Sequence, residues 1–112
     1  MKKDIIAFSD FEKLELRVGE VKEAVLFEGS KKLIVLKVDL GEDYGIVEIL
    51  SGLAPTYLPE NLIGNKYIFL ANLEPKKIMS KDSNGMMMVA DDPEKFALIP
   101  LDKNLKNGIV IR

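Results

Sequence analysis

The 112-residue chain contains neither cysteine nor histidine, and each absence excludes a class of chemistry. Without cysteine there is no disulfide framework, thiolate metal site or thiol nucleophile. Without histidine the chain lacks the commonest general base, the most frequent metal ligand and any Ser-His pair. The acidic pairs Glu42-Asp43 and Asp91-Asp92 lie in polar, turn-like segments, where solvated charge explains them. We therefore predict a non-catalytic protein with no metal site and no cofactor.

Long apolar runs are also missing. No stretch approaches the roughly 20 residues that cross a bilayer, so we expect no membrane segment. The start, Met1-Lys2-Lys3-Asp4, leads into only a short apolar stretch and does not resemble a signal peptide. Because small secreted domains usually need disulfides, we expect a cytoplasmic location. The composition, 47% hydrophobic and 30% charged, is typical of a globular chain, and we assign residues 1–112 to one domain.

Basic residues are slightly outnumbered, with 16 Lys and Arg against 18 Asp and Glu. This balance argues against a nucleic-acid partner, because phosphates are bound by Lys and Arg. The distribution of charge matters more than its sum, however. Eleven of the acids lie in the first 50 residues, and the tightest basic cluster, Lys76, Lys77 and Lys81, lies in the later half. Tryptophan is absent, so strong base stacking of the single-strand-binding kind is not expected.

Alternating apolar residues predict a series of short strands. The clearest runs from Lys32 to Leu40, with four apolar side chains on one face. A longer strand, Leu16 to Phe27, changes its alternation phase at Gly19-Glu20, which indicates a β-bulge. Further strands are expected at residues 46–50, 66–71 and 85–90, and short apolar pieces at 98–101 and 109–111. Ser9 and Glu12 have the spacing of a capping box that opens one helical turn.

Pro59 to Gly64 reads as one helical turn between the third and fourth strands. Five strands with a helix at that place have the order of the OB-fold, a partly open Greek-key barrel. The predicted fold is therefore all-β, a five-stranded OB-fold barrel with one short helix and a C-terminal extension. The pattern alone also fits a β-sandwich fragment or an SH3-like barrel.

Six sequence blocks in order carry a resemblance to a known family. They are Leu16-Arg17-Val18-Gly19-Glu20-Val21, Lys32-Leu33 through Leu40-Gly41, Ile49-Leu50-Ser51-Gly52-Leu53, Tyr57 through Gly64, Ala71-Asn72-Leu73-x-Pro75-Lys76-Lys77, and Ser83-x-Gly85-Met86. Together they resemble the tRNA-binding domain attached to many methionyl-tRNA synthetases, which also occurs in endothelial-monocyte-activating polypeptides, stand-alone tRNA-binding proteins and a small secretion chaperone. The resemblance extends from about Phe11 to the C-terminus.

This resemblance implies an OB-fold that binds the body of tRNA by shape. It also implies a homodimer whose C-terminal segments contribute to the interface, and methionyl-tRNA synthetase as a possible partner. Four positions depart from the family pattern. Glu28 and Lys31 stand where the family has a Pro and an acidic residue, Val47 stands where it has an Arg, and Ser80 stands where it has a Gly shortly before the Ser-x-Gly-Met block. The location of the RNA-contacting surface is therefore less strongly indicated than the fold.

Nine residues form the predicted tRNA-binding site. Five are lysines that can neutralise phosphates, and four belong to the Asn72 turn and the Ser83-x-Gly85-Met86 block: Lys32, Lys37, Lys76, Lys77 and Lys81, with Asn72, Ser83, Gly85 and Met86. Ser83 and nearby backbone amides could meet a phosphate or a 2′-hydroxyl, and Met86 offers an apolar surface to a base. The competing interpretation for Asn72 is a brace for its turn, and for the Ser83 block a tight turn into the last strand.

The sequence is also compatible with two functions other than tRNA binding. The first is a protein-binding chaperone on the same fold, favoured by the mildly acidic charge and by the run Met86-Met87-Met88, because methionines form adaptable binding surfaces. The second is an oligosaccharide-binding OB-fold, which the scarcity of aromatic residues disfavours. The terminal Ile109-Val110-Ile111 needs a partner, either on its own barrel or across a two-fold axis.

Overall fold

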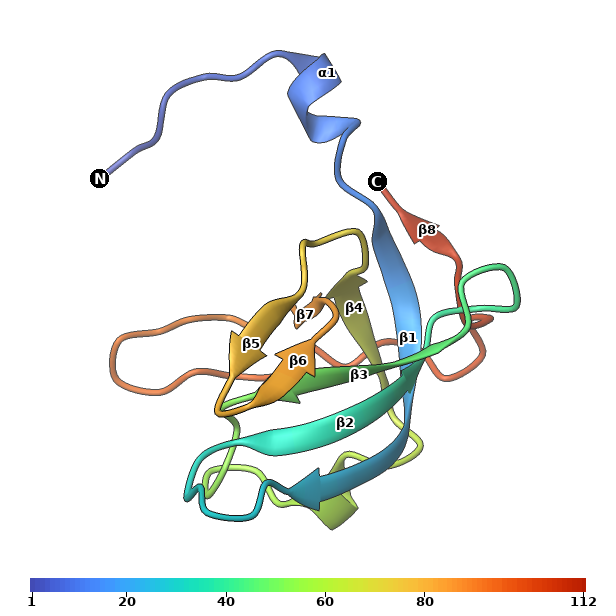
Figure 1. Cartoon of the computed structure of the whole chain (residues 1–112). Coiled ribbons are helices and arrows are strands. Elements are labelled where there is room, and N and C mark those ends of the chain that lie inside the picture. Colours follow the sequence, from blue (N-terminus) through green and yellow to red (C-terminus); the bar gives the residue numbers. More distant parts are fainter.

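The computed structural model describes residues 1–112 and shows a small barrel of antiparallel strands (Figure 1). Its sheet has the order β3-β2-β1-β4-β7, and β8 pairs with β1 from outside that path. The strands are β1 (Leu16–Leu26), β2 (Ile34–Asp39), β3 (Ile46–Ser51), β4 (Lys66–Leu70), β7 (Met86–Met87) and β8 (Val110–Ile111). A 3-10 helix, η1 (Pro59–Asn61), separates β3 from β4. The predicted OB-like barrel, with its helix between the third and fourth strands, is confirmed.

The barrel core is built from one face of each strand. In β2 the side chains of Ile34, Leu36 and Val38 are completely buried, as the alternation predicts. Tyr67 and Phe69 of β4 meet them from the other side of the barrel. Burying a large apolar side chain contributes about 1.5–3 kcal/mol. The alternating residues of β2 and β4 therefore supply much of the stability of the barrel.

Strand β1 pairs with three other strands. Its first half, Leu16 to Glu20, lies against β4, and Leu16 and Arg17 also pair with β8 on the opposite side. From Glu20 onward it lies against β2, with Glu20 paired to both Asp39 and Lys66. This exchange of partners along one strand lets the sheet curve into a barrel.

The irregularity in β1 lies later than the sequence predicts. The register shifts between Val21 and Glu23, so Lys22 is the extra residue opposite β2. The sequence placed the bulge at Gly19-Glu20 because Val25 was counted as a core residue. Val25 is instead 59% exposed, and Ala24 is the buried residue of this half. The predicted bulge is present, but its position was wrong.

The two free edges of the sheet meet at a seam between β3 and residues 83–84. The backbone N–H of Asn84 donates to the carbonyl of Glu48 at 2.9 Å. The backbone N–H of Leu50 donates to the Ser83 hydroxyl at 3.0 Å, and that hydroxyl donates to the Gly85 carbonyl at 3.1 Å. The barrel is therefore closed in part by a buried side chain.

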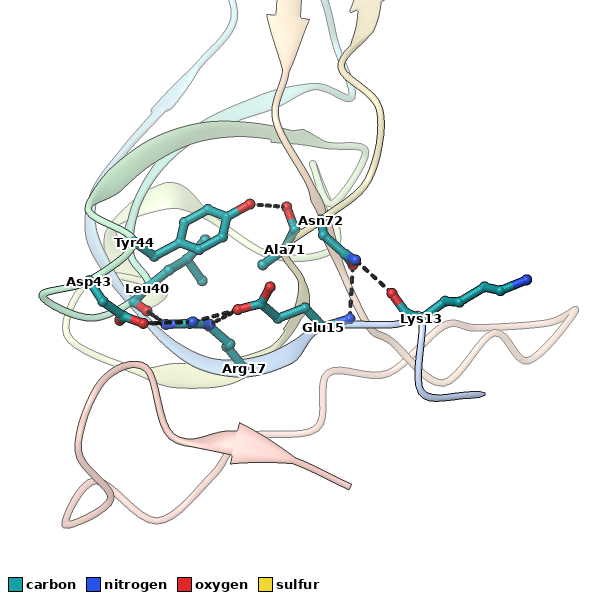
Figure 2. Close-up of polar contacts among 8 residues, drawn as sticks. All are labelled: Lys13, Glu15, Arg17, Leu40, Asp43, Tyr44, Ala71 and Asn72. Atoms are coloured by element: carbon teal, nitrogen blue, oxygen red, sulfur yellow. Dashed lines mark hydrogen bonds and ion pairs between the residues drawn. The ribbon is translucent and has the colours of Figure 1, made fainter. Parts of the chain in front are cut away.

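Arg17 is buried beside this barrel and holds the β2–β3 turn in place (Figure 2). Its guanidinium donates two hydrogen bonds to the Asp43 carboxylate, at 2.7 and 2.9 Å, and one to the Leu40 carbonyl at 3.1 Å. It also pairs with Glu15, and it lies over the Tyr44 ring at 5.1 Å from the centroid. These partners raise the pKa of Arg17, the Asp43 carboxylate most of all.

The C-terminal segment closes onto its own barrel. Gly108 donates its N–H to Val18 at 2.7 Å, and Val18 donates to Ile109 at 2.9 Å. The Asn107 amide donates to the carboxylates of Glu20 and Asp39, at 2.9 and 3.2 Å, and thereby lowers the pKa of Glu20. Of the two partners that the sequence left open for the terminal apolar residues, the structure thus shows pairing within the chain.

The helix α1 (Phe8–Phe11) lies within an N-terminal arm, residues 1–14, that extends away from the barrel (Figure 1). Its N-cap is Ala7, and no side chain caps it. The predicted capping box from Ser9 to Glu12 is therefore wrong, because the helix starts one residue before Ser9. Neither α1 nor η1 has the length that a membrane-crossing helix needs.

The seam generates a prediction for Ser83→Ala. Removing the hydroxyl leaves the Leu50 N–H without its acceptor, and a buried unsatisfied group costs about 1–3 kcal/mol. We expect the midpoint of urea denaturation to fall accordingly. The matched control is Ser9→Ala in the exposed helix α1, which should leave the midpoint nearly unchanged. Equal midpoints for Ser83→Ala and the wild type would contradict the role given to the hydroxyl.

The Arg17–Asp43 pair generates a prediction on acid stability. The guanidinium lowers the pKa of Asp43, so the pair stabilises the fold above the unfolded value of about 3.9 and stops doing so as the pH falls through the lower folded value. Between pH 7 and pH 3 the urea midpoint should fall further in the wild type than in Asp43→Asn. Glu42→Gln, at an exposed neighbouring carboxylate, should keep the wild-type pH dependence. An unaltered pH dependence in Asp43→Asn would show that the pair does not contribute.

Candidate nucleic-acid interface

The cluster of three lysines lies on a β-hairpin that the sequence did not predict. Its strands are β5 (Lys76–Ile78) and β6 (Lys81–Ser83), and it lies beside β3 (Figure 1). Met79 and Ser80 join the strands with φ angles of 50° and 73°. Two consecutive residues at positive φ are the mark of a type I′ turn, which matches the twist of a hairpin. The lysines are therefore held on a defined two-stranded element.

The hairpin register divides the lysines between two faces. Lys76 is paired with Ser83, and Ile78 with Lys81, so Lys76 and Lys81 lie on the face of the buried Ser83. Lys77 is paired with Asp82 on the other face. The structure thus brings Lys76 and Lys81 to one face and does not place Lys77 with them.

A groove of about 410 Å³ runs between this hairpin and the outer face of the sheet. Its walls come from β1, β2, β3, β6 and the loop after β1: Glu23, Val25, Leu26, Phe27, Glu28, Val35, Lys37, Glu48 and Lys81. Lys37 is 3.8 Å from the Glu23 carboxylate, and Lys81 is 3.2 Å from the Glu48 carboxylate. Both groove lysines are therefore already paired with acids.

Lys32 and Lys37 do not share a strand. Lys37 is an exposed residue of β2, whereas Lys32 is exposed in the loop that precedes it. The carbonyl of Lys32 accepts a hydrogen bond from Ala54, which fixes the backbone of this loop. The prediction that this strand begins at Lys32 is thus wrong, because β2 begins only at Ile34.

Ser83 and Gly85 form part of the barrel wall. Ser83 is buried, and its hydroxyl already makes both seam hydrogen bonds. Gly85 has a φ of +135°, and a Cβ atom there would lie 2.9 Å from the Leu70 carbonyl oxygen. The close backbone approach that glycine permits is made to the neighbouring strand. The tight turn into the last strand is thus present in the structure.

The three consecutive methionines have different surroundings. Met87 is buried in the core, Met88 is half-buried, and Met86 is 46% exposed. Alternation along β7 explains the difference between Met86 and Met87. Met86 is therefore available as an apolar surface beside the seam.

Asn72 connects the start of the hairpin loop to the N-terminal arm (Figure 2). Its side-chain oxygen accepts from the Glu15 N–H at 2.8 Å, and its side-chain nitrogen donates to the Lys13 carbonyl at 2.6 Å. The residue does brace backbone groups, as one interpretation of the sequence held. The groups belong to a segment nearly 60 residues earlier rather than to its own turn.

Two residues of this surface were missed in the sequence. Glu23 and Glu48 stand on either side of Lys37 in the paired registers of β1, β2 and β3. Alternation shows that Lys37 points outward, but it does not show which residues of neighbouring strands lie opposite. The signal is the strand register, which only the folded structure gives.

Comparison with known proteins places the chain among tRNA-binding domains. Residues 16–110 match the family model described as "Putative tRNA binding domain". The methionine–tRNA ligase of Caldanaerobacter subterraneus subsp. tengcongensis is 44% identical over 105 residues, covering 94% of this chain and 16% of the ligase. That of Thermococcus kodakarensis is 41% identical over 111 residues, covering 99% of this chain and 15% of the ligase. The chain thus spans about a sixth of these curated relatives.

Solved structures agree with the sequence matches. A MetRS-related protein from Pyrococcus horikoshii superposes with a TM-score of 0.92 and 35% identity, covering 98% of this chain and all of the other. The chaperone CsaA of Bacillus anthracis superposes with a TM-score of 0.85 and 28% identity, covering 97% of this chain and all of the other. Because the family model matches most of the chain, the protein belongs to the tRNA-binding domain family that is also found in methionine–tRNA ligases.

Proposed function

We propose that the chain binds tRNA without catalysing a reaction, and that the β5–β6 hairpin supplies the main phosphate contacts. This proposal is based on the two lysines of the hairpin that form no ion pair with a carboxylate. None of the ion pairs in the structure involves Lys76 or Lys77, which are both exposed on the hairpin. Their charges are therefore free to neutralise phosphates and release counterions.

The remaining predicted residues take two kinds of role in this proposal. Lys32, Lys37 and Lys81 extend the phosphate-contacting surface around the groove, and Met86 adds an exposed apolar contact beside it. Three residues shape the surface from within: Asn72 fixes the loop before the hairpin, and Ser83 and Gly85 hold the hairpin against β3 and β4. A rigid barrel with few exposed aromatic residues suits recognition of folded RNA by shape.

The relatives support the further proposal of a role beside methionyl-tRNA synthetase. The ligases that match the chain carry the equivalent domain as about a sixth of their length. The proposed contribution is affinity for tRNA in the cytoplasm, either as a free protein or as an accessory subunit. Catalysis would then remain with the synthetase.

We also propose a homodimer formed through the two ends of the chain. A groove of about 190 Å³ is lined mainly by apolar residues of α1, the segment after it and β8: Phe8, Phe11, Glu12, Leu14, Val110, Ile111 and Arg112. In the arm beside this groove, the Ile5 side chain is fully exposed and those of Ile6 and Phe8 are more than 60% exposed. The exposed apolar residues of the arm can cover the groove of a second copy in an isologous contact.

A protein-binding chaperone is the second candidate function. The observation that favours it is the apolar wall of the 410 Å³ groove, where Val25 and Leu26 are at least half exposed. The similarity to CsaA chaperones points in the same direction. A gel shift with intact tRNA and an aggregation assay with an unfolded client separate the two: a client effect without a tRNA shift would favour the chaperone.

Combined Lys76→Ala and Lys77→Ala should weaken tRNA binding. Each phosphate contact contributes about 0.7–0.9 to the slope of log affinity against log salt, so the double variant should flatten that slope by about 1–2. The measurement is tRNA affinity across a salt series. The control is Lys103→Ala with Lys106→Ala, the same charge change in the C-terminal segment, which should keep the wild-type slope. An equal slope in both double variants would remove the hairpin lysines from the site.

Val110→Asp should convert the proposed dimer to a monomer. A carboxylate placed in the apolar groove would be buried without a partner in the dimer, which is costly. Light scattering coupled to gel filtration should give twice the 12.5 kDa chain mass for the wild type and the single mass for the variant. The control is Val25→Asp, at another exposed valine on a strand but away from the arm, and this variant should remain dimeric. A wild-type protein of single mass would refute the dimer.

A further inference from the structure

Four charged residues of alternating sign cross the outer face of the barrel in one row. Glu23 of β1 lies opposite Lys37 of β2, and Lys37 lies opposite Glu48 of β3. Lys81 of β6 completes the row with its ammonium 3.2 Å from the Glu48 carboxylate. Glu48 therefore stands between the two lysines that line the groove.

The groove consequently carries more negative than positive charge. Its lining contains three carboxylates, Glu23, Glu28 and Glu48, and two ammonium groups, Lys37 and Lys81. A phosphate that approaches either lysine also meets the carboxylate that is paired with it. The net attraction that this groove offers to a single phosphate is therefore small, in contrast to the unpaired Lys76 and Lys77 on the hairpin.

The ion pairs in the row are nevertheless easy to exchange. All four side chains are more than one third exposed, and ion pairs at such sites contribute little to stability. An RNA already held by the hairpin brings further phosphates to the groove at high effective concentration. A flexible RNA meets these lysines one phosphate at a time, so the groove adds much less to its affinity.

We propose that Glu48 is a selectivity residue, which suppresses binding of unstructured RNA by holding Lys81 neutralised and by adding a second carboxylate beside Lys37. This inference rests on the proposed tRNA-binding function and adds a determinant of specificity to the same surface. The selectivity arises because the Glu48 charge opposes the binding of unstructured RNA more than the binding of folded tRNA. Only an RNA whose fold presents several phosphates to the hairpin and the groove together overcomes it.

The test is Glu48→Gln, which keeps the size of the side chain, removes its charge and leaves the backbone carbonyl that accepts from Asn84. Affinities are measured for intact tRNA and for an unfolded RNA of equal length over a salt series. We expect both RNAs to bind more tightly, with a slope steeper by about 1, because Lys81 is freed while Lys37 keeps its ion pair with Glu23. The gain should be larger for the unfolded RNA, so that the preference for tRNA falls about three- to tenfold.

Two further variants make the test specific. Glu60→Gln removes an exposed carboxylate on η1 and should leave both affinities unchanged. Glu48→Gln combined with Lys81→Ala should lose most of the gain, because the freed charge of Lys81 is then absent. Circular dichroism and a urea titration confirm that each variant is folded before its binding is interpreted.

The possible outcomes separate this inference from the function on which it rests. A folded wild-type protein that binds no tRNA would overturn both. Tight binding by the wild type, with no change in Glu48→Gln, would overturn the inference and leave the function intact. An equal gain in affinity for both RNAs would show that Glu48 repels any RNA. Weaker binding of RNA by Glu48→Gln would show that Glu48 positions Lys81. Each result would overturn the proposed selectivity.

Discussion

The structure depends on one strand that must pair with three others. Strand β1 lies against β4 and β8 in its first half and against β2 in its second, and the partner changes at Glu20, two residues before the extra residue Lys22. A one-residue shift of register at Lys22 is needed to keep Val21 and Ala24 both in the core. The buried Arg17 then ties the first half of β1 to the β2–β3 turn through Asp43. The curvature of the barrel and the position of its loops both follow from this strand.

The seam turns this curvature into a binding surface. Because Ser83 and Asn84 attach to β3, the hairpin that ends at Ser83 must stand over the outer face of the β1–β2–β3 sheet. Its lysines therefore differ in setting although they are close in sequence. Lys81 faces Glu48 across the groove, whereas Lys77 points to the other side with Asp82. The net charge of the chain does not reveal this division of the lysines between paired and unpaired positions.

The sequence predicted the elements whose residues alternate strongly and missed those that depend on pairing. The alternation in β2 and the Pro59 turn were enough for the barrel. The β5–β6 hairpin was not predicted, because Lys76 to Ser83 lacks an apolar alternation and its turn contains no Gly or Asn, the usual residues at positive φ. The bulge was misplaced because Val25 is the larger apolar residue, although Ala24 fills the core. At the site, the lysines were visible in the sequence, but the opposing Glu23 and Glu48 were not, because their positions depend on register.

One amide side chain joins the N-terminal arm to the β5–β6 hairpin. Asn72 bonds to Lys13 and Glu15 on one side and begins the loop that leads into the hairpin on the other. In the proposed dimer, a second copy seated against the N-terminal arm would hold Lys13 in place and, through Asn72, the base of the lysine-bearing hairpin. By thermodynamic linkage the reverse holds equally, so RNA held on the hairpin would favour assembly of the chain. In a linked system of this kind, the affinity for RNA rises with protein concentration, and self-association becomes part of recognition.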